Sequence, residues 1–385
     1  MQLGSERLVA STRLDGLRVG VLANPASVDR GFQHIADLLA NSNRHKLTAI
    51  FGPQHGYSSD LQDNMIETPH GKDRRRNIPV FSLYSETREP TKEMLELIDV
   101  LVVDLQDVGA RIYTFIYTLA NCLRAAARHG LPVIVCDRPN PIGGLQVEGP
   151  TLEPGYESFV GQFRMPMRHG LTIAELARLF NEHHGIGAEL EIAPMEGWRR
   201  DLYFDATGLP WVMPSPNMPA LDTAIAYPGT VLFEGTKLSE GRGTTRPFEL
   251  IGAPWLHGDE LAARLNKAEL GGVHFRKVAF EPTFQKHARV PCGGVQIHVT
   301  DRNAFAPVKT GVSLLRECFG LAPSEFAWRD PPYEYEHEKM PIDILAGSPL
   351  LRQQIEAQVP LAEIVESWDV GEAEFREIRQ DYLLY

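Results

Sequence analysis

Carboxylates, amides and arginines that could hold or cleave a polar ligand follow two apolar runs in the N-terminal third of the chain. The run D-L-Q-D-V-G-A-R places Asp104, Asp107 and Arg111 directly after the first of these apolar runs. Asp137 and Arg138 repeat the arrangement after the second. A carboxylate at the end of a buried strand must be ion-paired or hydrogen-bonded. These groups therefore either bind a ligand or cap the following helix beside an arginine, and the pattern leaves both interpretations open.

A second group of candidates lies between residues 215 and 248. Asn217 stands between two prolines, which fix the backbone on both sides and suit either a rigid turn or a well-positioned ligand contact. The loop 233–248 carries Glu234, Glu240, Arg242 and Arg246 among glycines and hydroxyl residues. A flexible linker has no need of glutamate and arginine alternating with glycine, so we expect this loop to belong to a site.

These residue types suit carbohydrate chemistry. A glycosidase needs one protonated carboxyl near the leaving oxygen and a second anionic group across the sugar ring. Hydroxyl and acetamido groups pair with Asn, Gln and Asp, and arginine offers a two-pronged contact to a carboxylated sugar. The residues alone predict an acidic sugar or polyol as ligand, bound in a cleft between two domains.

The elements that must position these residues are apolar strands alternating with helical patterns. Helices are predicted over 32–40, 92–98 and 114–129, and strands over Leu17–Ala23, Leu47–Phe51, Ile78–Leu83, Val100–Leu105 and Pro132–Cys136. Such alternation predicts a parallel sheet covered on both faces. Ligands bind at the carboxyl ends of such strands. Asn24, Asp104, Asp107, Asp137 and Asn140 are therefore expected at one edge, together with Gln54 and His55.

The remainder of the chain changes character near Gly229. A capping box at Thr172 and Glu175 begins a helix predicted to reach His184. Farther on, strands are predicted over 273–280 and 294–299, and helices over 259–268 and 308–319. The fold class is therefore predicted as α/β, with a Rossmann-like parallel-sheet domain at 1–229 followed by a smaller mixed α/β auxiliary domain at 230–385.

Composition and missing motifs exclude several classes of protein. The net charge of −12 and the absence of a Lys/Arg cluster argue against a nucleic-acid partner. The sequence shows no G-x-G-x-x-G, Walker A or G-x-S-x-G motif and no metal-ligand spacing, so we expect no cofactor and no metal. No apolar stretch is long enough to span a membrane. The first residues lack an apolar signal region and Cys122 and Cys136 suit reduced core thiols, so the cytoplasm is expected unless an export signal was removed.

A series of motifs adds a resemblance to this interpretation. The chain carries, in order, P-Q-H-G-Y, Q-D-N-M, D-L-Q-D-V-G-A-R-I-Y-T, D-R-P-N-P-I-G-G, V-E-G-P, R-H-G-L-T-I-A-E-L-A, P-S-P-N-M-P, A-Y-P-G and F-E-G-T-K-L-S-E-G-R-G-T-T-R-P-F-E. Over about residues 17–385 it resembles the exo-β-N-acetylmuramidase family of bacterial cell-wall recycling, glycoside hydrolase family 171. The resemblance implies release of N-acetylmuramic acid from the non-reducing end of peptidoglycan fragments, without a cofactor, in a cleft between two domains.

One position departs from the pattern of that family. Many members have P-E-H-G, with a glutamate favoured as the catalytic acid, where this chain has Gln54. A glutamine amide cannot donate a proton as a general acid. Glu240 and Asp104 are the expected replacements, with His55 as a possible proton carrier. The substrate contacts expected beside these are Asn24, Asp107, Arg111, Tyr113, Asp137, Asn140, Asn217, Glu234, Arg242 and Arg246.

Three functions remain open on the sequence. The first is an exo-acting glycoside hydrolase, and Arg242 or Arg111 is then expected to bind the lactyl carboxylate of muramic acid. The second is a catalytically weak muropeptide-binding protein or sensor, because of Gln54. The third is a lyase or etherase acting on the same sugar. In each case the partner is a small carbohydrate, a muramyl saccharide or muropeptide, and the oligomeric state is left undetermined.

Overall fold

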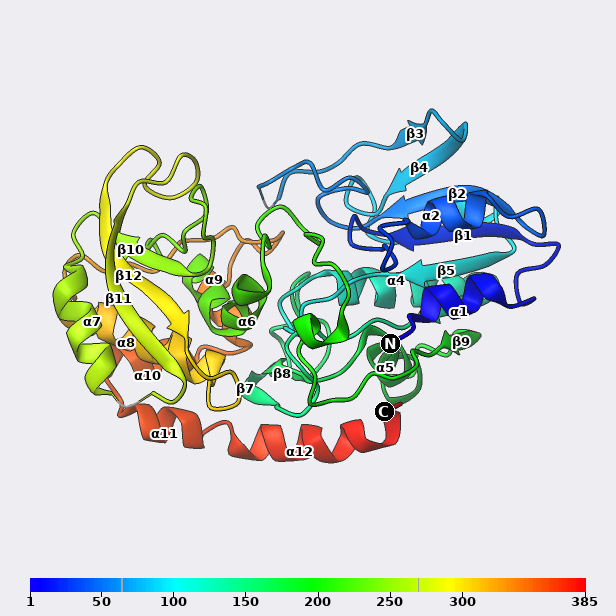
Figure 1. The fold of residues 1–385 in the computed structure, drawn as a ribbon. Coiled ribbons are helices and arrows are strands. Elements are labelled where there is room, and N and C mark those ends of the chain that lie inside the picture. The colour runs from blue at the N-terminus through cyan, green and yellow to red at the C-terminus, as the bar shows by residue number, and fades with distance from the viewer. Residues whose placement is uncertain (64, 269) are drawn as a thin grey trace.

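A seven-stranded sheet forms the N-terminal half of the computed structural model, which describes residues 1–63, 65–268 and 270–385 (Figure 1). The strand order is β3-β4-β2-β1-β5-β6-β9, and every neighbouring pair is parallel except β3 with β4. The strands are β1 (Arg18–Ala23), β2 (Lys46–Gly52), β3 (Gly71–Asp73), β4 (Ile78–Ser82), β5 (Val100–Asp104), β6 (Val133–Cys136) and β9 (Leu190–Ala193). All five strands predicted from the apolar runs are present, and the predicted fold class is confirmed.

Helices cover both faces of this sheet, which explains why its strands are apolar throughout. Along β5, Val100 and Val102 join the cluster that contains Leu8 of α1 (Gly4–Ala10) and Leu39 of α2 (Ile35–Ala40). The alternate residues of β5 face the opposite cluster, with α3 (Lys92–Leu95), α4 (Phe115–His129) and α5 (Ile173–Arg178). Since side chains alternate across a strand, both sets of positions are buried.

Two predicted helix ends are confirmed by their local chemistry. Thr172 and Glu175 form the expected capping box at the start of α5, although the helix passes into a π turn over Leu179–His183. The helix α4 ends at Gly130, which takes a left-handed conformation with φ of 63°. A residue without a Cβ adopts that conformation at no steric cost, and it closes the helix.

The C-terminal half is built on a three-stranded antiparallel sheet in the order β10-β12-β11. Its strands are β10 (Leu250–Ala253), β11 (Val273–Phe280) and β12 (Cys292–Val299), and its helices include α7 (Gly258–Lys267) and α8 (Pro307–Leu321). The helix α6 (Leu221–Thr230) packs against α8 so closely that a Cβ at Gly229 would lie 1.8 Å from the carbonyl oxygen of Pro307. Only glycine fits at that crossing.

The last part of the chain runs back along the molecule to the N-terminal half (Figure 1). The path is α9 (Pro341–Ala346), α10 (Leu350–Glu356), α11 (Leu361–Glu366), α12 (Asp369–Arg379) and a 3₁₀ turn, Gln380–Tyr382. The remaining pieces are the antiparallel pair β7 (Glu148–Thr151) and β8 (Pro166–Arg168) and two 3₁₀ turns, Phe204–Thr207 and Val231–Gly235. The sequence analysis did not predict α9–α12.

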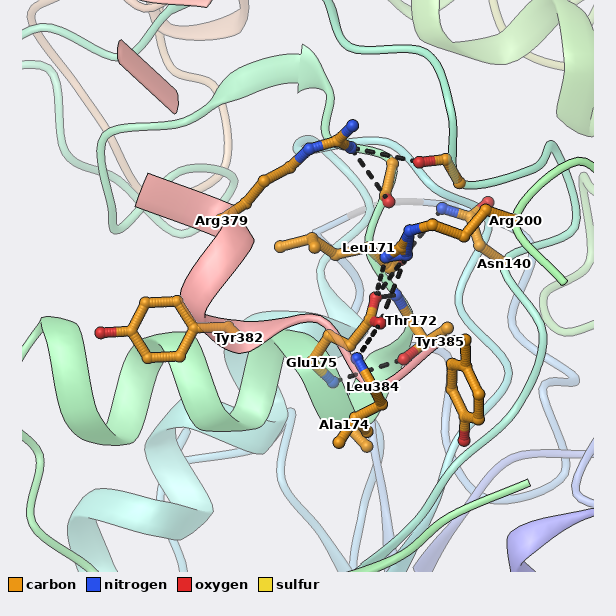
Figure 2. A network of polar contacts seen from close by, with 12 residues as sticks. Asn140, Leu171, Thr172, Ala174, Glu175, Arg200, Arg379, Tyr382, Leu384 and Tyr385 are labelled. Carbon is orange, nitrogen blue, oxygen red and sulfur yellow. Dashed lines mark hydrogen bonds and ion pairs between the residues drawn. The ribbon is translucent and has the colours of Figure 1, made fainter. Parts of the chain in front are cut away.

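A polar network fastens the chain end to the sheet (Figure 2). The backbone nitrogen of Leu384 donates to Glu175 at 2.8 Å, and Arg200 pairs with the same carboxylate at 2.6 Å. The guanidinium of Arg379 donates to backbone carbonyls that include that of Gly170, at 3.2 Å. The Tyr385 hydroxyl donates to the Asp137 carboxylate at 2.9 Å. The C-terminus is thus held at the carboxyl end of β6.

All four cysteines are free, buried thiols, as expected for Cys122 and Cys136. Among the described residues, none of the helices has the length and apolar character that crossing a membrane requires.

Candidate active site

A cavity with about 480 Å³ of empty space, counted together with its opening to solvent, lies where loops of the parallel sheet meet segments of the C-terminal half. Gln54 and His55 come from the loop after β2, residues 112–114 from the segment between β5 and α4, and Phe115 is the first residue of α4. Glu234 lies in the 3₁₀ turn after α6, and Glu334 in the loop before α9. The lining residues are Gln54, His55, Ile112, Tyr113, Thr114, Phe115, Val160, Ser215, Asn217, Met218, Tyr227, Glu234, Arg242, Phe248, Tyr333 and Glu334.

Gln54 is fixed at both ends of its amide. Its oxygen accepts a hydrogen bond of 2.6 Å from the Thr114 hydroxyl, and its nitrogen donates to Glu334 at 3.3 Å. The second oxygen of the Glu334 carboxyl accepts from the Tyr84 hydroxyl at 3.1 Å. Gln54 therefore presents a donor to a buried carboxyl group that the sequence analysis did not identify.

Glu334 is a carboxyl group of the cavity with a near-neutral pKa. Burial and the negative charge of Glu234 raise its pKa to about 7, against the opposing hydrogen bonds from Tyr84 and Gln54. Burial and the charge of Glu334 likewise raise the pKa of Tyr84, so this hydroxyl stays a donor. A near-neutral pKa on a carboxyl in a cavity is the usual condition of a general acid.

Glu234 stands in a different environment within the same cavity. Arg242 pairs with one of its oxygens at 2.5 Å, and the Tyr333 hydroxyl donates to the other at 2.6 Å. For Arg242 itself, burial favours the neutral form, but Glu234 and Glu240 outweigh it and raise its pKa. The cavity thus holds one carboxylate paired with a cation and one carboxyl group whose polar neighbours are mainly neutral donors.

Glu240, the expected acid, is held as a carboxylate behind the wall of the cavity. Lys286 pairs with it at 2.7 Å and Arg242 lies 3.8 Å away. Burial opposes the ionisation of Glu240, but these two cations outweigh it and lower its pKa. A carboxylate with a lowered pKa holds no proton at neutral pH, so Glu240 cannot be the general acid in this arrangement.

His55 lines the cavity as a neutral imidazole, whose single ring hydrogen is already bound within the protein. Its Nδ1 lies 2.7 Å from the backbone oxygen of Leu61, which can only accept, so the ring hydrogen is on Nδ1. Burial is the main cause that lowers its pKa to about 4. The expectation of a near-neutral proton carrier is therefore wrong, and His55 offers Nε2 as an acceptor.

The structure brings six of the predicted site residues together and places the other eight elsewhere. Those in the wall of the cavity are Gln54, His55, Tyr113, Asn217, Glu234 and Arg242. Those outside it are Asn24, Asp104, Asp107, Arg111, Asp137, Asn140, Glu240 and Arg246.

The strand-end residues are used to join the loops that follow neighbouring strands. Arg138 binds both oxygens of Asp104, at 2.5 and 2.9 Å, inside the protein. The Asn24 amide donates to the backbone of Gln106 at 3.2 Å. Asp104 is 0% exposed, so it cannot be the proton donor to a ligand in the cavity and this assignment is wrong.

Asp107, Asp137 and Asn140 also have structural roles in neighbouring loops. Asp107 accepts from the backbone nitrogen of Gly109 at 2.7 Å, and Asn140 donates to the carbonyl of Leu171 at 2.9 Å. Asp137 accepts from the backbone nitrogens of Arg138 and Ala174, both at 3.0 Å. Asp137 caps the helix α5 that follows its strand, as the capping alternative expected, whereas Asp107 fixes the turn that it begins and Asn140 joins two loops.

Neither Arg111 nor Arg246 reaches the cavity. Arg111 is fully buried, donates to the carbonyl of Leu345 at 2.9 Å, and has its pKa lowered to about 10 by burial. Arg246 is half exposed and pairs with Glu249 at 3.1 Å. Of the two arginines proposed for the lactyl carboxylate, Arg242 alone lines the cavity, and Arg111 is excluded in this conformation.

The sequence analysis missed Tyr84, Tyr227, Tyr333 and Glu334. A signal for the last two is present in the run P-P-Y-E-Y-E at 331–336, where two prolines precede alternating aromatic and acidic residues. The motif Q-D-N-M is described only in part, because Asn64 lies outside the described residues.

Comparison with known proteins covers the whole chain. The N-terminal family model of the exo-beta-N-acetylmuramidase NamZ matches residues 19–222, and its C-terminal model matches residues 225–385. The peptidoglycan beta-N-acetylmuramidase NamZ of Bacillus subtilis (strain 168) is 44% identical over 387 aligned positions, which cover 100% of this chain and 91% of that relative.

Two solved structures share the fold from end to end. Both are DUF1343 family proteins from Bacteroides fragilis NCTC 9343, and each comparison covers 100% of this chain and 98% of the other. One is 34% identical with a TM-score of 0.90, and the other is 26% identical with a TM-score of 0.79.

Proposed function

This chain belongs to the exo-β-N-acetylmuramidase NamZ family, and on that premise we propose that it releases N-acetylmuramic acid from the non-reducing end of peptidoglycan fragments. It is a glycoside hydrolase of the exo-β-N-acetylmuramidase type. We place its active site in the cavity between the parallel-sheet half and the C-terminal half.

The observation that carries this proposal is the pair of unlike carboxyl groups in the wall of the cavity. Glu234 is paired with Arg242, whereas the pKa of Glu334 is raised to about 7. Glycoside hydrolysis needs one protonated carboxyl and one ionised carboxylate at the scissile bond. A carboxyl group with a raised pKa, beside a second one that is paired with a cation, meets that need.

Arg242 is the proposed ligand of the lactyl carboxylate that distinguishes muramic acid from glucosamine. Its Nη2 binds Glu234, and its buried Nε finds no hydrogen-bond partner among the described residues. A guanidinium–carboxylate contact in such a cleft contributes roughly 1.5–3 kcal/mol. Tyr113 and Asn217 line the same cavity and can serve the hydroxyl and acetamido groups of the sugar.

The test is an assay of the purified protein with the N-acetylmuramyl–N-acetylglucosamine disaccharide and a chromogenic N-acetylmuramide, with binding measured by calorimetry. We expect free N-acetylmuramic acid from both substrates. Tight binding of the disaccharide without turnover of either substrate supports the muropeptide-binding alternative, which Gln54 suggested. Release of lactate or of an unsaturated sugar identifies an etherase or a lyase.

A further inference from the structure

The loop that carries Glu334 is shaped to hold one side chain inward and the next one outward. Glu334 and its neighbour Tyr335 both have positive φ values, 44° and 69°, and an isolated bridge joins Tyr333 to Glu336. Residues other than glycine are rarely held in this conformation, and such strain persists where the surroundings fix it. Glu334 is 3% exposed in the cavity wall, whereas Tyr335 is 42% exposed.

The contacts of Glu334 come from three separate parts of the chain. The loop after β2 contributes the amide of Gln54, and Tyr84, two residues beyond β4, contributes its hydroxyl. The backbone nitrogen of Glu334 lies 3.2 Å from the sulfur of Met65, which belongs to the same loop after β2 as Gln54. Glu234, in the 3₁₀ turn after α6, lines the same cavity as Glu334 and acts on its charge, and Arg242 is the ion-pair partner of Glu234. The carboxyl is therefore oriented by neutral donors and lies near one other carboxylate.

We propose that Glu334 is the general acid of this hydrolase and that Gln54 is the residue that positions it; this inference deepens the proposed function and rests on it. The Gln54 amide nitrogen holds the Glu334 carboxyl at 3.3 Å, and its amide oxygen is itself fixed by the Thr114 hydroxyl. A second carboxyl at that distance would share a proton with Glu334. With an amide there, the proton belongs to Glu334.

The step balances as an ordinary hydrolysis. The Glu334 carboxyl gives its proton to the glycosidic oxygen, and the bond between that oxygen and the anomeric carbon breaks with its electron pair on the oxygen. A water oxygen forms the new bond to the anomeric carbon, and the proton that this water loses goes to the Glu234 carboxylate. Exchange with solvent then returns a proton to Glu334 and removes one from Glu234.

The main test compares two substrates in the Glu334→Gln variant. Losing a general acid lowers kcat on the disaccharide by about 10²–10⁴-fold. An aryl N-acetylmuramide has a leaving group that needs little protonation, so its kcat should fall less than about tenfold. Equal losses on both substrates, or no loss on the disaccharide, overturn the proposal. Glu336→Gln is the matched control, because Glu336 lies outside the cavity and pairs with Lys339.

A second test uses the pH profile, which a purely structural role would not move. With Glu334 as acid, kcat on the disaccharide falls as pH rises through about 7. The groups that interact with this carboxyl are Glu234, Arg242, Tyr84, Tyr227, Tyr333 and the amide of Gln54. The Tyr84 hydroxyl favours the ionised form, so Tyr84→Phe should move the alkaline limb to higher pH. An unmoved limb contradicts the assignment even if Glu334→Gln fails to fold.

The Gln54→Glu variant separates the two possible positions of the acid. If Glu334 already donates the proton, this variant changes kcat on the disaccharide by less than about tenfold. A gain of tenfold or more returns the role to position 54 and overturns the proposal. Wild-type protein that turns over neither substrate contradicts the proposed function itself, whereas turnover that survives Glu334→Gln contradicts only the assignment of the acid.

Discussion

Asp137 and Glu334 are buried carboxyl groups with nearly the same electrostatics in two different regions of the molecule. Burial and a neighbouring carboxylate raise the pKa of each to about 7; the neighbour is Glu175 for Asp137 and Glu234 for Glu334. Around Asp137, the hydroxyls of Thr172 and Tyr385 both donate at 2.9 Å and close the site. Glu334 instead faces a cavity.

The comparison shows that a perturbed pKa does not by itself mark a reactive group. Burial next to Glu175 raises the pKa of Asp137, and this carboxyl serves to fasten the C-terminus to the sheet. Glu334 keeps its proton for the same electrostatic reason, but the cavity lets a substrate take it. Access to a ligand, rather than the pKa, separates a structural carboxyl from a catalytic one.

The largest expected effect concerns the buried ion pair between Asp104 and Arg138, at the strand ends next to Asp137. Arg138→Met leaves Asp104 as an uncompensated charge inside the protein and should lower the free energy of unfolding by about 3–5 kcal/mol. Denaturant unfolding measures this loss. The control is Arg18→Met, whose partner Asp99 is 37% exposed, and this variant should lower the free energy of unfolding much less. Equal losses for the two variants would mean that the strand-end pair is not a structural anchor.

The next effect concerns the cavity and should appear in binding. Arg242→Lys should weaken N-acetylmuramyl ligands by about tenfold or more, because the lactyl carboxylate loses its contact with the guanidinium. Plain N-acetylglucosaminides lack that carboxylate and should be affected much less. Calorimetry with both ligands checks this, and Arg246→Lys, outside the cavity, is the control. The same loss for both sugars would make Arg242 a structural ion-pair residue only.

A smaller effect is expected at the chain end. Tyr385→Phe removes the hydrogen bonds to Asp137 and from the backbone nitrogen of Met195, so the free energy of unfolding should fall by about 1–2 kcal/mol. The kcat of the folded enzyme should stay unchanged. Tyr382→Phe is the control, because the described contacts of that side chain are ring contacts with Arg178 and His183. A lower kcat in Tyr385→Phe would mean that the hydrogen bonds around Asp137 affect catalysis as well as stability.

The smallest effect is on the pH dependence of stability. Asp137, Glu148 and Glu334 all have pKa values raised to about 7, so the folded protein binds more protons than the unfolded chain between pH ~4 and ~7. The stabilising contribution of these three groups is therefore fully present below this window and is lost as pH rises through it. Unfolding at pH 5 and at pH 8 should differ less in Glu334→Gln than in the wild type. An unchanged difference would contradict the raised pKa of Glu334.

The sequence predicted the sheet well because strand periodicity is local information. The strand Val100–Asp104 is buried on both faces, and its unbroken run of apolar residues is typical of a strand between two layers of helices. The short pair β7 and β8 and the C-terminal helices gave weaker patterns, because their stability comes from packing against distant parts of the chain.

The site was predicted only in part, for a physical reason. The rule that ligands bind at strand ends applies to Gln54, but it equally selected Asp104, whose charge is neutralised by Arg138 one strand away. Sequence cannot distinguish a carboxylate that meets a cation from one that meets a cavity. Glu334 lies 280 positions from Gln54, and only the folded chain brings them together.

The most direct measurement is a crystal structure of the Glu334→Gln variant with the uncleaved disaccharide bound. We predict the glycosidic oxygen within hydrogen-bond distance of the side chain at position 334, and the lactyl carboxylate on Arg242. A sugar bound in the cavity with its glycosidic oxygen against another carboxyl group, or bound at the strand ends near Asp104, would contradict the account.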